Sequence, residues 1–342
     1  MANSWLTVKQ LSVSFALTRG LFAPRRALRA VTDVSLQLKA GEALGIVGES
    51  GCGKSTLARA ILQLVRPDSG CVVWMGRQLT PLTRREMRPL RRELQIIFQD
   101  PLASLDPRMT VGEIIAEPLR VHRPDLDRAA RRSCVEAMLE RVGMSSEVIN
   151  RYPHEFSGGQ CQRIGIARAM IVEPKLLICD EPVSALDVSI QAQVINLLKT
   201  LQRDTGMSII FVSHNLAVVR RLCDRVLVLY LGRVMEMATT HALYDRPTHP
   251  YTRGLLQAVP LPDPDVQPGR LGTSLRGELP SPLDPPSGCV FRTRCPEARA
   301  ICALSTPTLE SVESSSIGDD VHEVACLRWR ELPAHPSGYN RI

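Results

Sequence analysis

An apolar run, a glycine-rich loop and a helical pattern follow one another early in the chain. Residues 44–47 are apolar, residues 48–55 read Gly-Glu-Ser-Gly-Cys-Gly-Lys-Ser, and the helical pattern begins at Thr56. This is the pattern G-x-x-x-x-G-K-[ST] between a strand and a helix. Its glycines let backbone N–H groups converge on phosphate oxygens at a helix N-terminus. The chain is therefore expected to bind a nucleotide on an α/β layer through this phosphate loop (P-loop).

Lys54 and Ser55 have distinct expected roles in the P-loop. Lys54 should reach the β- and γ-phosphates, and the Ser55 hydroxyl should bind Mg²⁺. The candidate nucleotide-binding residues of this segment are Gly48, Ser50, Gly51, Gly53, Lys54, Ser55 and Thr56.

Two further apolar runs end in polar residues that suit nucleotide hydrolysis. Residues 176–179 lead into Asp180. Residues 209–212 lead into His214. Such runs are typical of strands buried on both faces of a parallel sheet, and ligands lie at the carboxyl ends of such strands. Asp180 is expected to contact Mg²⁺, and Glu181 to orient and deprotonate a water, unless it is an ordinary surface glutamate.

A second glycine-rich turn, Phe-Ser-Gly-Gly-Gln at residues 156–160, lies in the chain between the P-loop and the acidic pair. A turn of this kind opening a helix implies that one ATP is clasped by two polypeptides. It resembles the signature of the ATP-binding cassette family, and residues 184–187 resemble the family's D-loop. The resemblance implies a head-to-tail dimer in which this signature contacts ATP held by the other subunit. The residues carried over are Ser157, Gly158, Gly159, Gln160 and Asp187.

The resemblance also assigns roles to three residues outside these motifs. Gln99 matches the Q-loop glutamine, which senses Mg²⁺ and the attacking water, although a polar strand end is the alternative. His214 matches the switch histidine that contacts the γ-phosphate. Phe15 is the expected adenine-stacking residue, with Phe22 as a nearby alternative. The implied catalytic residues are Glu181, His214 and Gln99, and the implied Mg²⁺ ligands are Ser55, Gln99 and Asp180.

The expected fold class is α/β: a P-loop NTPase (RecA-like) core with an N-terminal antiparallel β subdomain and a helical signature subdomain, plus a proline-rich C-terminal extension. The core alternates short apolar runs with helical patterns. More than half of the 25 prolines follow residue 246, a density that precludes long helices and central strands. The expected domains are a cassette at residues 1–245, its helical subdomain at about residues 101–168, and an extension at residues 246–342. The extension must be held by docking or by a metal, or remain extended.

The composition is that of an ordinary globular protein, with 44% hydrophobic and 23% charged residues in a chain of 342. Its apolar runs fall far short of the roughly 20 residues of a membrane helix. No apolar signal-peptide segment opens the chain, so we expect that it neither crosses a membrane nor is exported. The net charge is +7, but arginines in residues 84–92 alternate with Glu, Leu and Met. This pattern is typical of a solvated helix face, and no nucleic acid is expected as a partner.

Residues 99–108, 179–189 and 248–252 resemble the ATPase subunits of peptide importers. Residues 155–160 and 164–169 are similar to the second of the two dissimilar ATPases in dipeptide and oligopeptide importers. The resemblance implies an ATP-hydrolysing, energy-coupling subunit with ATP and Mg²⁺ as cofactors, at the cytoplasmic face of a bacterial inner membrane. The implied partners are a second ATPase subunit (a heterodimer, or else a homodimer), two transmembrane permease subunits and, indirectly, an extracytoplasmic substrate-binding protein.

Three other functions stay open. The cargo is alternatively nickel, glutathione or another small solute, because relatives that carry these share the same stretches. A soluble cassette ATPase acting on nucleic acid or ribosomes is the rival class, but only about 100 residues separate Ser55 from Ser157, without the heptads of a coiled coil. A regulatory role as a redox sensor is a possible addition.

Four of the ten cysteines lie in the C-terminal extension, at Cys289, Cys295, Cys302 and Cys326. Without a secretory signal, metal binding is a better expectation than disulfides. They resemble cysteines that hold an iron–sulfur cluster in some peptide-importer ATPases, which implies a 4Fe-4S cluster, with zinc as the alternative. Four reduced, packed thiols are the plain alternative. The signature departs from the family pattern at Cys161, where the family usually has Arg. The loss of a cation near the phosphate is expected to lower the affinity for ATP or the rate at which the dimer closes.

Overall fold

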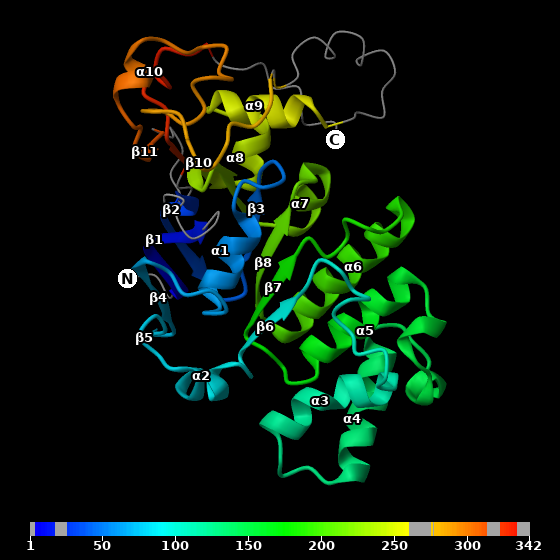
Figure 1. The fold of residues 1–342 in the computed structure, drawn as a ribbon. Coiled ribbons are helices and arrows are strands. Elements are labelled where there is room, and N and C mark those ends of the chain that lie inside the picture. The colour runs from blue at the N-terminus through cyan, green and yellow to red at the C-terminus, as the bar shows by residue number, and fades with distance from the viewer. Residues whose placement is uncertain (1–3, 18–25, 260–274, 276, 313–321, 334–342) are drawn as a thin grey trace. The chain divides into compact units, whose positions relative to one another are not determined.

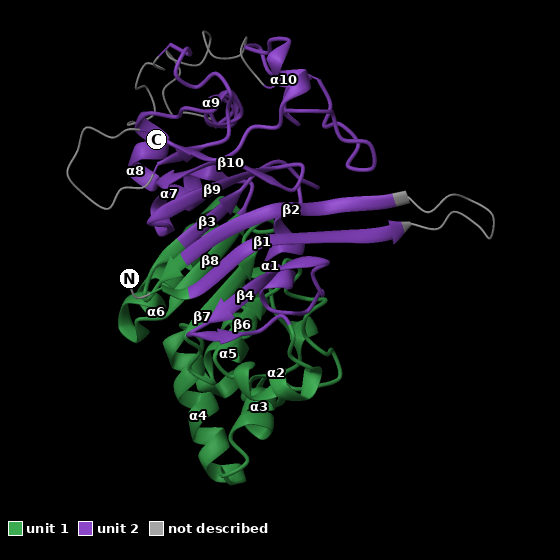
Figure 2. Cartoon of the chain, turned by 90° about the vertical axis from the view of Figure 1, so that its left-hand side faces the viewer, with its two compact units in different colours: residues 1–5, 38–43, 81–212 green, residues 6–37, 44–80, 213–342 purple. Residues whose placement is uncertain are grey.

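The computed structural model describes residues 4–17, 26–259, 275, 277–312 and 322–333. The chain divides into two compact units (Figure 2). Unit 1 comprises residues 1–5, 38–43 and 81–212, and unit 2 comprises residues 6–37, 44–80 and 213–342. The extension expected from residue 246 onward groups with the P-loop segment in unit 2.

Unit 1 is built on three parallel strands in the order β8-β7-β6. Every residue of β7 and β8 is buried, which explains their uninterrupted apolar sequences. The register places Leu94 beside Leu176, and Leu176 beside Ser208. The strands are β6 (Leu94–Ile97), β7 (Leu176–Asp180) and β8 (Ser208–Ser213).

Helices make up the rest of unit 1. Helix α5 packs against β6, and α3 packs against both α4 and α5 (Figure 1). Thr110 and Glu113 form a capping box at the start of α3, which satisfies the first N–H groups of that helix. The segment expected as a helical subdomain, residues 101–168, holds α3, α4 and most of α5. The helices are α2 (Arg84–Leu90), α3 (Val111–His122), α4 (Arg128–Arg141), α5 (Gly158–Met170) and α6 (Val188–Thr205), with 3-10 turns at Ser146–Asn150 and Pro153–Glu155.

Unit 2 contains most of an antiparallel sheet in the order β2-β1-β4-β5. Leu6 pairs with Trp74 and Val8 with Val72, so one face of β1 and β4 is buried in the core. The strands are β1 (Ser4–Leu17), β2 (Arg26–Lys39), β4 (Ser69–Trp74) and β5 (Arg77–Gln78). The predicted α/β class with an N-terminal antiparallel β subdomain is confirmed.

A second set of strands in unit 2 runs in the order β11-β12-β10-β9-β3. β3 and β9 are parallel, and the other pairs are antiparallel. The strands are β3 (Ala43–Val47), β9 (Arg225–Tyr230), β10 (Arg233–Thr239), β11 (Glu310–Ser311) and β12 (Glu323–Val324), and the helices are α1 (Lys54–Ile61), α7 (Leu216–Leu222), α8 (Thr240–Asp245), α9 (Pro250–Gln257) and α10 (Ile301–Leu304).

The described part of the C-terminal extension docks on β10. β12 adds to the edge of β10, and the fully buried carboxylate of Glu236 in β10 binds two segments of the extension that lie far apart in the sequence. Glu236 accepts hydrogen bonds from the backbone N–H groups of Thr248 (2.7 Å) and His249 (2.9 Å), and its Oε1 lies 2.7 Å from Nε2 of His322. A buried carboxylate is tolerated only with such partners. The described residues of the extension are therefore docked on β10, which is one of the expected ways of holding it.

No helix in the described residues is long and apolar enough to span a bilayer.

Candidate nucleotide site

The P-loop connects β3 to α1 in unit 2, as the sequence predicts. Gly53 is the residue before α1 and has φ 105°, in the left-handed region. A Cβ atom on Gly53 would lie 2.0 Å from the carbonyl oxygen of Ala30, and one on Gly48 would lie 2.2 Å from that of Leu229. The loop is thus pressed against backbone at both ends, and only glycine fits. Gly51 and Ser50, between them, are exposed.

Lys54 is buried although it carries a charge, with 4% of its surface exposed. Its Nζ donates hydrogen bonds to the carbonyl oxygens of Gly48 (2.8 Å) and Glu49 (2.9 Å). The ammonium group is therefore held inside the curve of the loop. Ser55 and Thr56 follow it as half-buried residues in the first turn of α1, at the end of the helix dipole that favours anions.

The acidic pair lies at the end of β7 in unit 1. Asp180 is fully buried, and Glu181 has φ 49°, an uncommon conformation for a residue other than glycine. The Glu181 backbone N–H donates to the carbonyl oxygen of Val212 (3.0 Å), which fixes this conformation. Nε2 of Gln99 donates to Oε2 of Glu181 (3.3 Å), so the structure brings together two predicted catalytic residues. Strain of this type clusters at functional sites.

The signature turn forms the N-terminus of α5 in unit 1. Ser157 caps the helix: its hydroxyl accepts from the N–H of Gln160 (3.4 Å), and the Gln160 side chain accepts from the N–H of Ser157 (3.0 Å). A Cβ atom on Gly159 would lie 2.6 Å from Cγ2 of Ile190, so this glycine permits close approach to α6. Ser157 and Gln160 are exposed, and Gly158 is half-buried. The positive end of the α5 dipole therefore reaches the surface with a capped, glycine-rich first turn.

The remaining predicted residues are exposed. Asp187 precedes α6 without a side-chain cap, and the next residue, Val188, is 82% exposed. His214 follows β8 and is exposed. Phe15, near the end of β1, is 38% exposed, which leaves its ring available for stacking. Phe22 lies outside the described residues.

Cys161 is the residue that departs from the family pattern, and its side chain is buried in unit 1. It is fully buried, and its thiol donates to the carbonyl oxygen of Pro153 (3.4 Å). Burial also raises the pKa of this thiol. The side chain at position 161 is directed into the interior of unit 1, which does not support the expectation that a cation near the phosphate is lost at this position.

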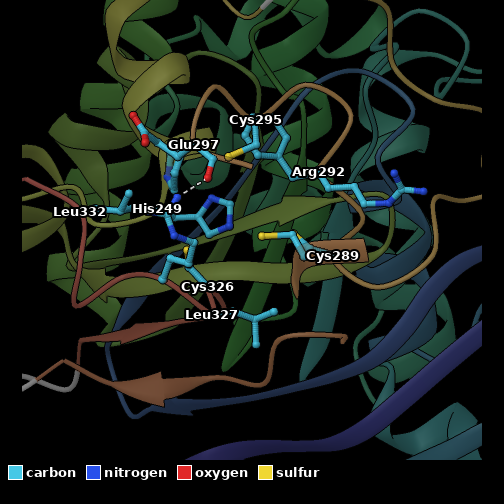
Figure 3. A pocket seen from close by; sticks show the side chains of 12 residues that line it. His249, Cys289, Arg292, Cys295, Glu297, Cys326, Leu327 and Leu332 are labelled. Carbon is cyan, nitrogen blue, oxygen red and sulfur yellow. Dashed lines mark hydrogen bonds between the residues drawn. The ribbon is translucent and has the colours of Figure 1, made fainter. Parts of the chain in front are cut away.

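The four cysteines of the extension line one small cavity of about 20 Å³ in unit 2 (Figure 3). Burial raises the pKa of Cys289 and Cys326, and it raises that of Cys295 to about 12. In the part of the chain that the structure describes, no three His, Cys, Asp or Glu side chains are grouped so as to hold a metal ion. The thiols therefore share a cavity without forming a ready ligand set, and the 4Fe-4S or zinc site expected there is not supported by this arrangement.

Two family models and two relatives show which family the chain belongs to. The family model described as "ABC transporter" matches residues 31–184, and that described as "Oligopeptide/dipeptide transporter, C-terminal region" matches residues 235–302. The oligopeptide transport ATP-binding protein OppF of Escherichia coli (strain K12) is 56% identical over 326 residues, which cover 94% of this chain and 96% of that protein. The chain belongs to the ATP-binding cassette (ABC) transporter family. OppF of Haemophilus influenzae is 55% identical over the same length, with the same coverage. This chain is an ABC ATPase.

Solved ABC cassettes have the same fold. The dimeric post-hydrolysis structure of the ATP-binding cassette MJ0796, bound to ADP and Pi, superposes with a TM-score of 0.62 and 28% identity. The match covers 69% of this chain and 98% of that one. The P-loop NTPase class predicted from the sequence is confirmed.

Three residues around the P-loop were missed by sequence reasoning. The Glu49 side chain forms an ion pair with Arg294, and its backbone N–H donates to the hydroxyl of Tyr251 (2.9 Å). Arg294 directly precedes Cys295, but no periodicity or spacing links it to a loop 245 positions earlier. Only the folded arrangement of unit 2 shows the connection.

Proposed function

We propose that this ABC ATPase is the energy-coupling subunit of a bacterial inner-membrane importer for dipeptides or oligopeptides. The observation that carries the proposal is the 56% identity, over nearly the whole of both chains, to a protein named for oligopeptide transport. The match of residues 235–302 to the C-terminal region of oligopeptide and dipeptide transporters supports the same cargo. Nickel, glutathione or another small solute is the alternative.

The P-loop supplies the phosphate contacts in this proposal. Backbone N–H groups at Gly48, Gly51 and Gly53 face the phosphates, together with Ser50 and Thr56, and Lys54 moves from the loop carbonyls to the β- and γ-phosphates. Ser55, Gln99 and Asp180 would hold Mg²⁺, directly or through water. Phe15 stacks on adenine. The buried position of Lys54 and the tight fit of Gly48 and Gly53 support these roles.

Glu181 acts as the general base. Its carboxylate orients the attacking water and accepts its proton, Gln99 holds the carboxylate and senses the metal, and His214 contacts the γ-phosphate. The hydrogen bond between Gln99 and Glu181 and the left-handed backbone of Glu181 support this assignment.

The signature acts on ATP bound by a partner cassette. Ser157, Gly158, Gly159 and Gln160 offer the N-terminus of α5 to the γ-phosphate, and Asp187 lies at the dimer contact. The exposure of Ser157, Gln160 and Asp187 supports a role at an interface. ATP then joins two cassettes, and hydrolysis releases them.

The partners follow from this role. A second ABC ATPase subunit completes a heterodimer, with a homodimer as the alternative. Closure of the two ATPase subunits is transmitted to two transmembrane permease subunits at the cytoplasmic face of the membrane. An extracytoplasmic binding protein delivers cargo to the permease subunits. Action on nucleic acid or ribosomes is the rival function, and a redox-sensing role is a possible addition. Neither has support from the family matches.

The cysteine cavity is a separate proposal. Cys289, Cys295, Cys302 and Cys326 are the residues that would hold a 4Fe-4S cluster or, alternatively, zinc, because they share one cavity. The arrangement of the four cysteines, which are thiols here, would have to change when a metal binds, because a bound metal deprotonates its cysteine ligands. A bound cluster would hold the extension together. It would take no part in ATP hydrolysis.

The test is recovery of the partners. The Glu181→Gln variant, tagged in its native cells, is extracted from membranes in mild detergent with ATP, and the copurifying proteins are identified. Two membrane subunits and a second ABC ATPase are expected. Lys54→Ala, which loses the phosphate contact, is the matched control and should recover less of the second ATPase. Recovery with ribosomes or DNA in place of membrane subunits would overturn the importer function while leaving the ATPase assignment intact.

A further inference from the structure

Glu49, the second residue of the P-loop, is fixed through its backbone. Its N–H donates to the hydroxyl of Tyr251 (2.9 Å), a fully buried residue of α9. Its carbonyl oxygen accepts from Nζ of Lys54 (2.9 Å). The peptide groups on both sides of Glu49 therefore have defined partners, one of them within the C-terminal extension.

The Glu49 side chain is fixed by Arg294. Nη1 and Nη2 of Arg294 lie 2.5 Å and 3.0 Å from Oε2 and Oε1 of Glu49, a bidentate geometry. Only 5% of the Arg294 side chain and 29% of the Glu49 side chain are exposed, so solvent screens this pair poorly. The hydrogen bonds to Glu49 raise the pKa of Arg294. Charge-assisted bidentate pairs of this kind are short and strong.

Arg294 is held in turn by residues 289–295, here called the cysteine turn. Its backbone N–H donates to the carbonyl oxygen of Phe291 (3.0 Å). The buried ring of Phe291 packs against Tyr230 and Tyr251, each with ring centroids 5.2 Å away. Cys289 and Cys295, at the two ends of the turn, line the cysteine cavity. The position of the guanidinium group therefore depends on how this turn is folded.

We infer that Arg294 is a positioning residue for the P-loop, through which the cysteine turn sets the affinity of the loop for the triphosphate. The inference deepens the proposed ATP-binding role of the P-loop and rests on it. Arg294 neutralises a carboxylate that directly follows Gly48. Without the arginine, Glu49 would repel the phosphates and its side chain would lose the ion pair that fixes it.

The test measures ATP affinity of the full-length chain by displacement of a fluorescent ATP analogue. Arg294→Ala is expected to bind ATP about ten-fold more weakly, and the loss should shrink at high salt because it is electrostatic. Glu49→Gln combined with Arg294→Ala should recover most of the affinity, because no unpaired carboxylate remains. The KM for ATP should rise while kcat stays near its original value, since Arg294 does not touch the reacting atoms.

Arg292→Ala is the matched control. Arg292 lies in the same turn, but its guanidinium donates to the carbonyl oxygen of Ser287 (2.9 Å) and not to the P-loop, so unchanged ATP affinity is expected. Should Arg294→Ala fail to fold by circular dichroism, Arg294→Gln keeps most of the side-chain volume and carries the same predictions.

Unchanged affinity after loss of Arg294, or a loss that Glu49→Gln does not relieve, would overturn the inference. Failure of the proposed function looks different: the original protein and Lys54→Ala would then bind ATP equally poorly.

Discussion

The side-chain amide of Gln99 donates a hydrogen bond to the carboxylate of Glu181, with 3.3 Å between the two atoms. The residues lie 82 positions apart and follow the neighbouring parallel strands β6 and β7. Glu181 also has a left-handed backbone, at φ 49°. Two independent features of unit 1 thus define where this carboxylate points, as expected of a general base that must meet a water in one orientation.

Glu181→Gln should abolish turnover and keep ATP binding. Glutamine preserves the shape and the hydrogen bond with Gln99 but cannot accept a proton, so kcat should fall by about 10²–10⁴-fold. Steady-state phosphate release and equilibrium ATP binding measure the two effects. Gln99→Ala serves for comparison, with a smaller fall in kcat. Hydrolysis by Glu181→Gln near the original rate would remove Glu181 as the base.

Gly53→Ala should impair both folding and ATP binding. A left-handed backbone alone costs a residue with a Cβ atom about 1–2 kcal/mol, and here the Cβ atom would also meet the Ala30 carbonyl oxygen at 2.0 Å. Gly76→Ala is the control, because Gly76 has φ 83° but no atom within 4 Å of the added Cβ. Denaturant unfolding should show a larger loss for Gly53→Ala, and only that variant should bind ATP more weakly. Equal losses in the two variants would contradict the tight fit of the loop.

Cys161 should matter for stability and not for nucleotide affinity. Cys161→Ala is expected to lower the free energy of unfolding by about 1–2 kcal/mol, and Cys161→Arg by about 3 kcal/mol or more, because the site is fully buried. ATP affinity of Cys161→Ala should match that of the original protein. A clear change in affinity, with unfolding unaffected, would restore the phosphate-facing position that the family pattern suggests.

Cys295→Ser should decide the metal proposal. If the cavity holds a 4Fe-4S cluster, the protein purified without oxygen contains iron and acid-labile sulfide, and the variant loses both together with the brown colour. Zinc without sulfide would indicate the alternative. Cys134→Ser, on α4 in unit 1, is the control and should change neither metal content nor colour. Equal metal content in Cys295→Ser and the original protein would show that this cysteine is not a ligand.

His249 should make the protein less stable in acid. Burial lowers its pKa to about 4 against an ordinary 6.5, with Glu236 opposing and Arg253 adding to the shift. Its Nδ1 accepts a hydrogen bond from the N–H of Tyr251 (3.0 Å), which requires that nitrogen to be unprotonated. The unfolded chain takes up this proton below pH about 6.5 and the folded chain only near pH 4. The free energy of unfolding should therefore fall by up to about 3 kcal/mol as pH drops through this window.

His249→Asn is the control for this pH dependence. Asparagine can still accept the Tyr251 N–H at the start of α9, but it does not titrate. Denaturant unfolding between pH 4 and pH 7 should show a shallower dependence for the variant. If the free energy of unfolding depends equally on pH in both proteins, His249 is not the source of this dependence.

Local patterns predicted the parts of the fold that depend on neighbours in the sequence. The apolar runs before the P-loop, Asp180 and His214 are β3, β7 and β8, since strands buried on both faces have no polar alternation. The signature turn opens a helix, as expected, and the structure adds that Ser157 and Gln160 form a capping box there.

Contacts between distant segments were not predictable from the same patterns. Nothing near Cys161 in the sequence indicates that its side chain points inward, because the helix α5 is buried over most of its surface. The docking of the extension depends on single buried groups such as Glu236, which leave no periodic signal. The four cysteines line one cavity, but their spacing in the sequence does not determine their separation in space.

The pair of Glu49 and Arg294 spans 245 positions and has a consequence for the order in which the protein is made. At about 5–20 residues per second, Arg294 leaves the ribosome roughly 12–50 s after the P-loop. Most of unit 1 comes from one continuous stretch, residues 81–212, and can fold during this interval. The counter-charge of the P-loop is therefore synthesised only after all of unit 1. A chain that stalls before residue 294 would therefore carry a P-loop without its arginine, and it should bind ATP more weakly than the longer chain.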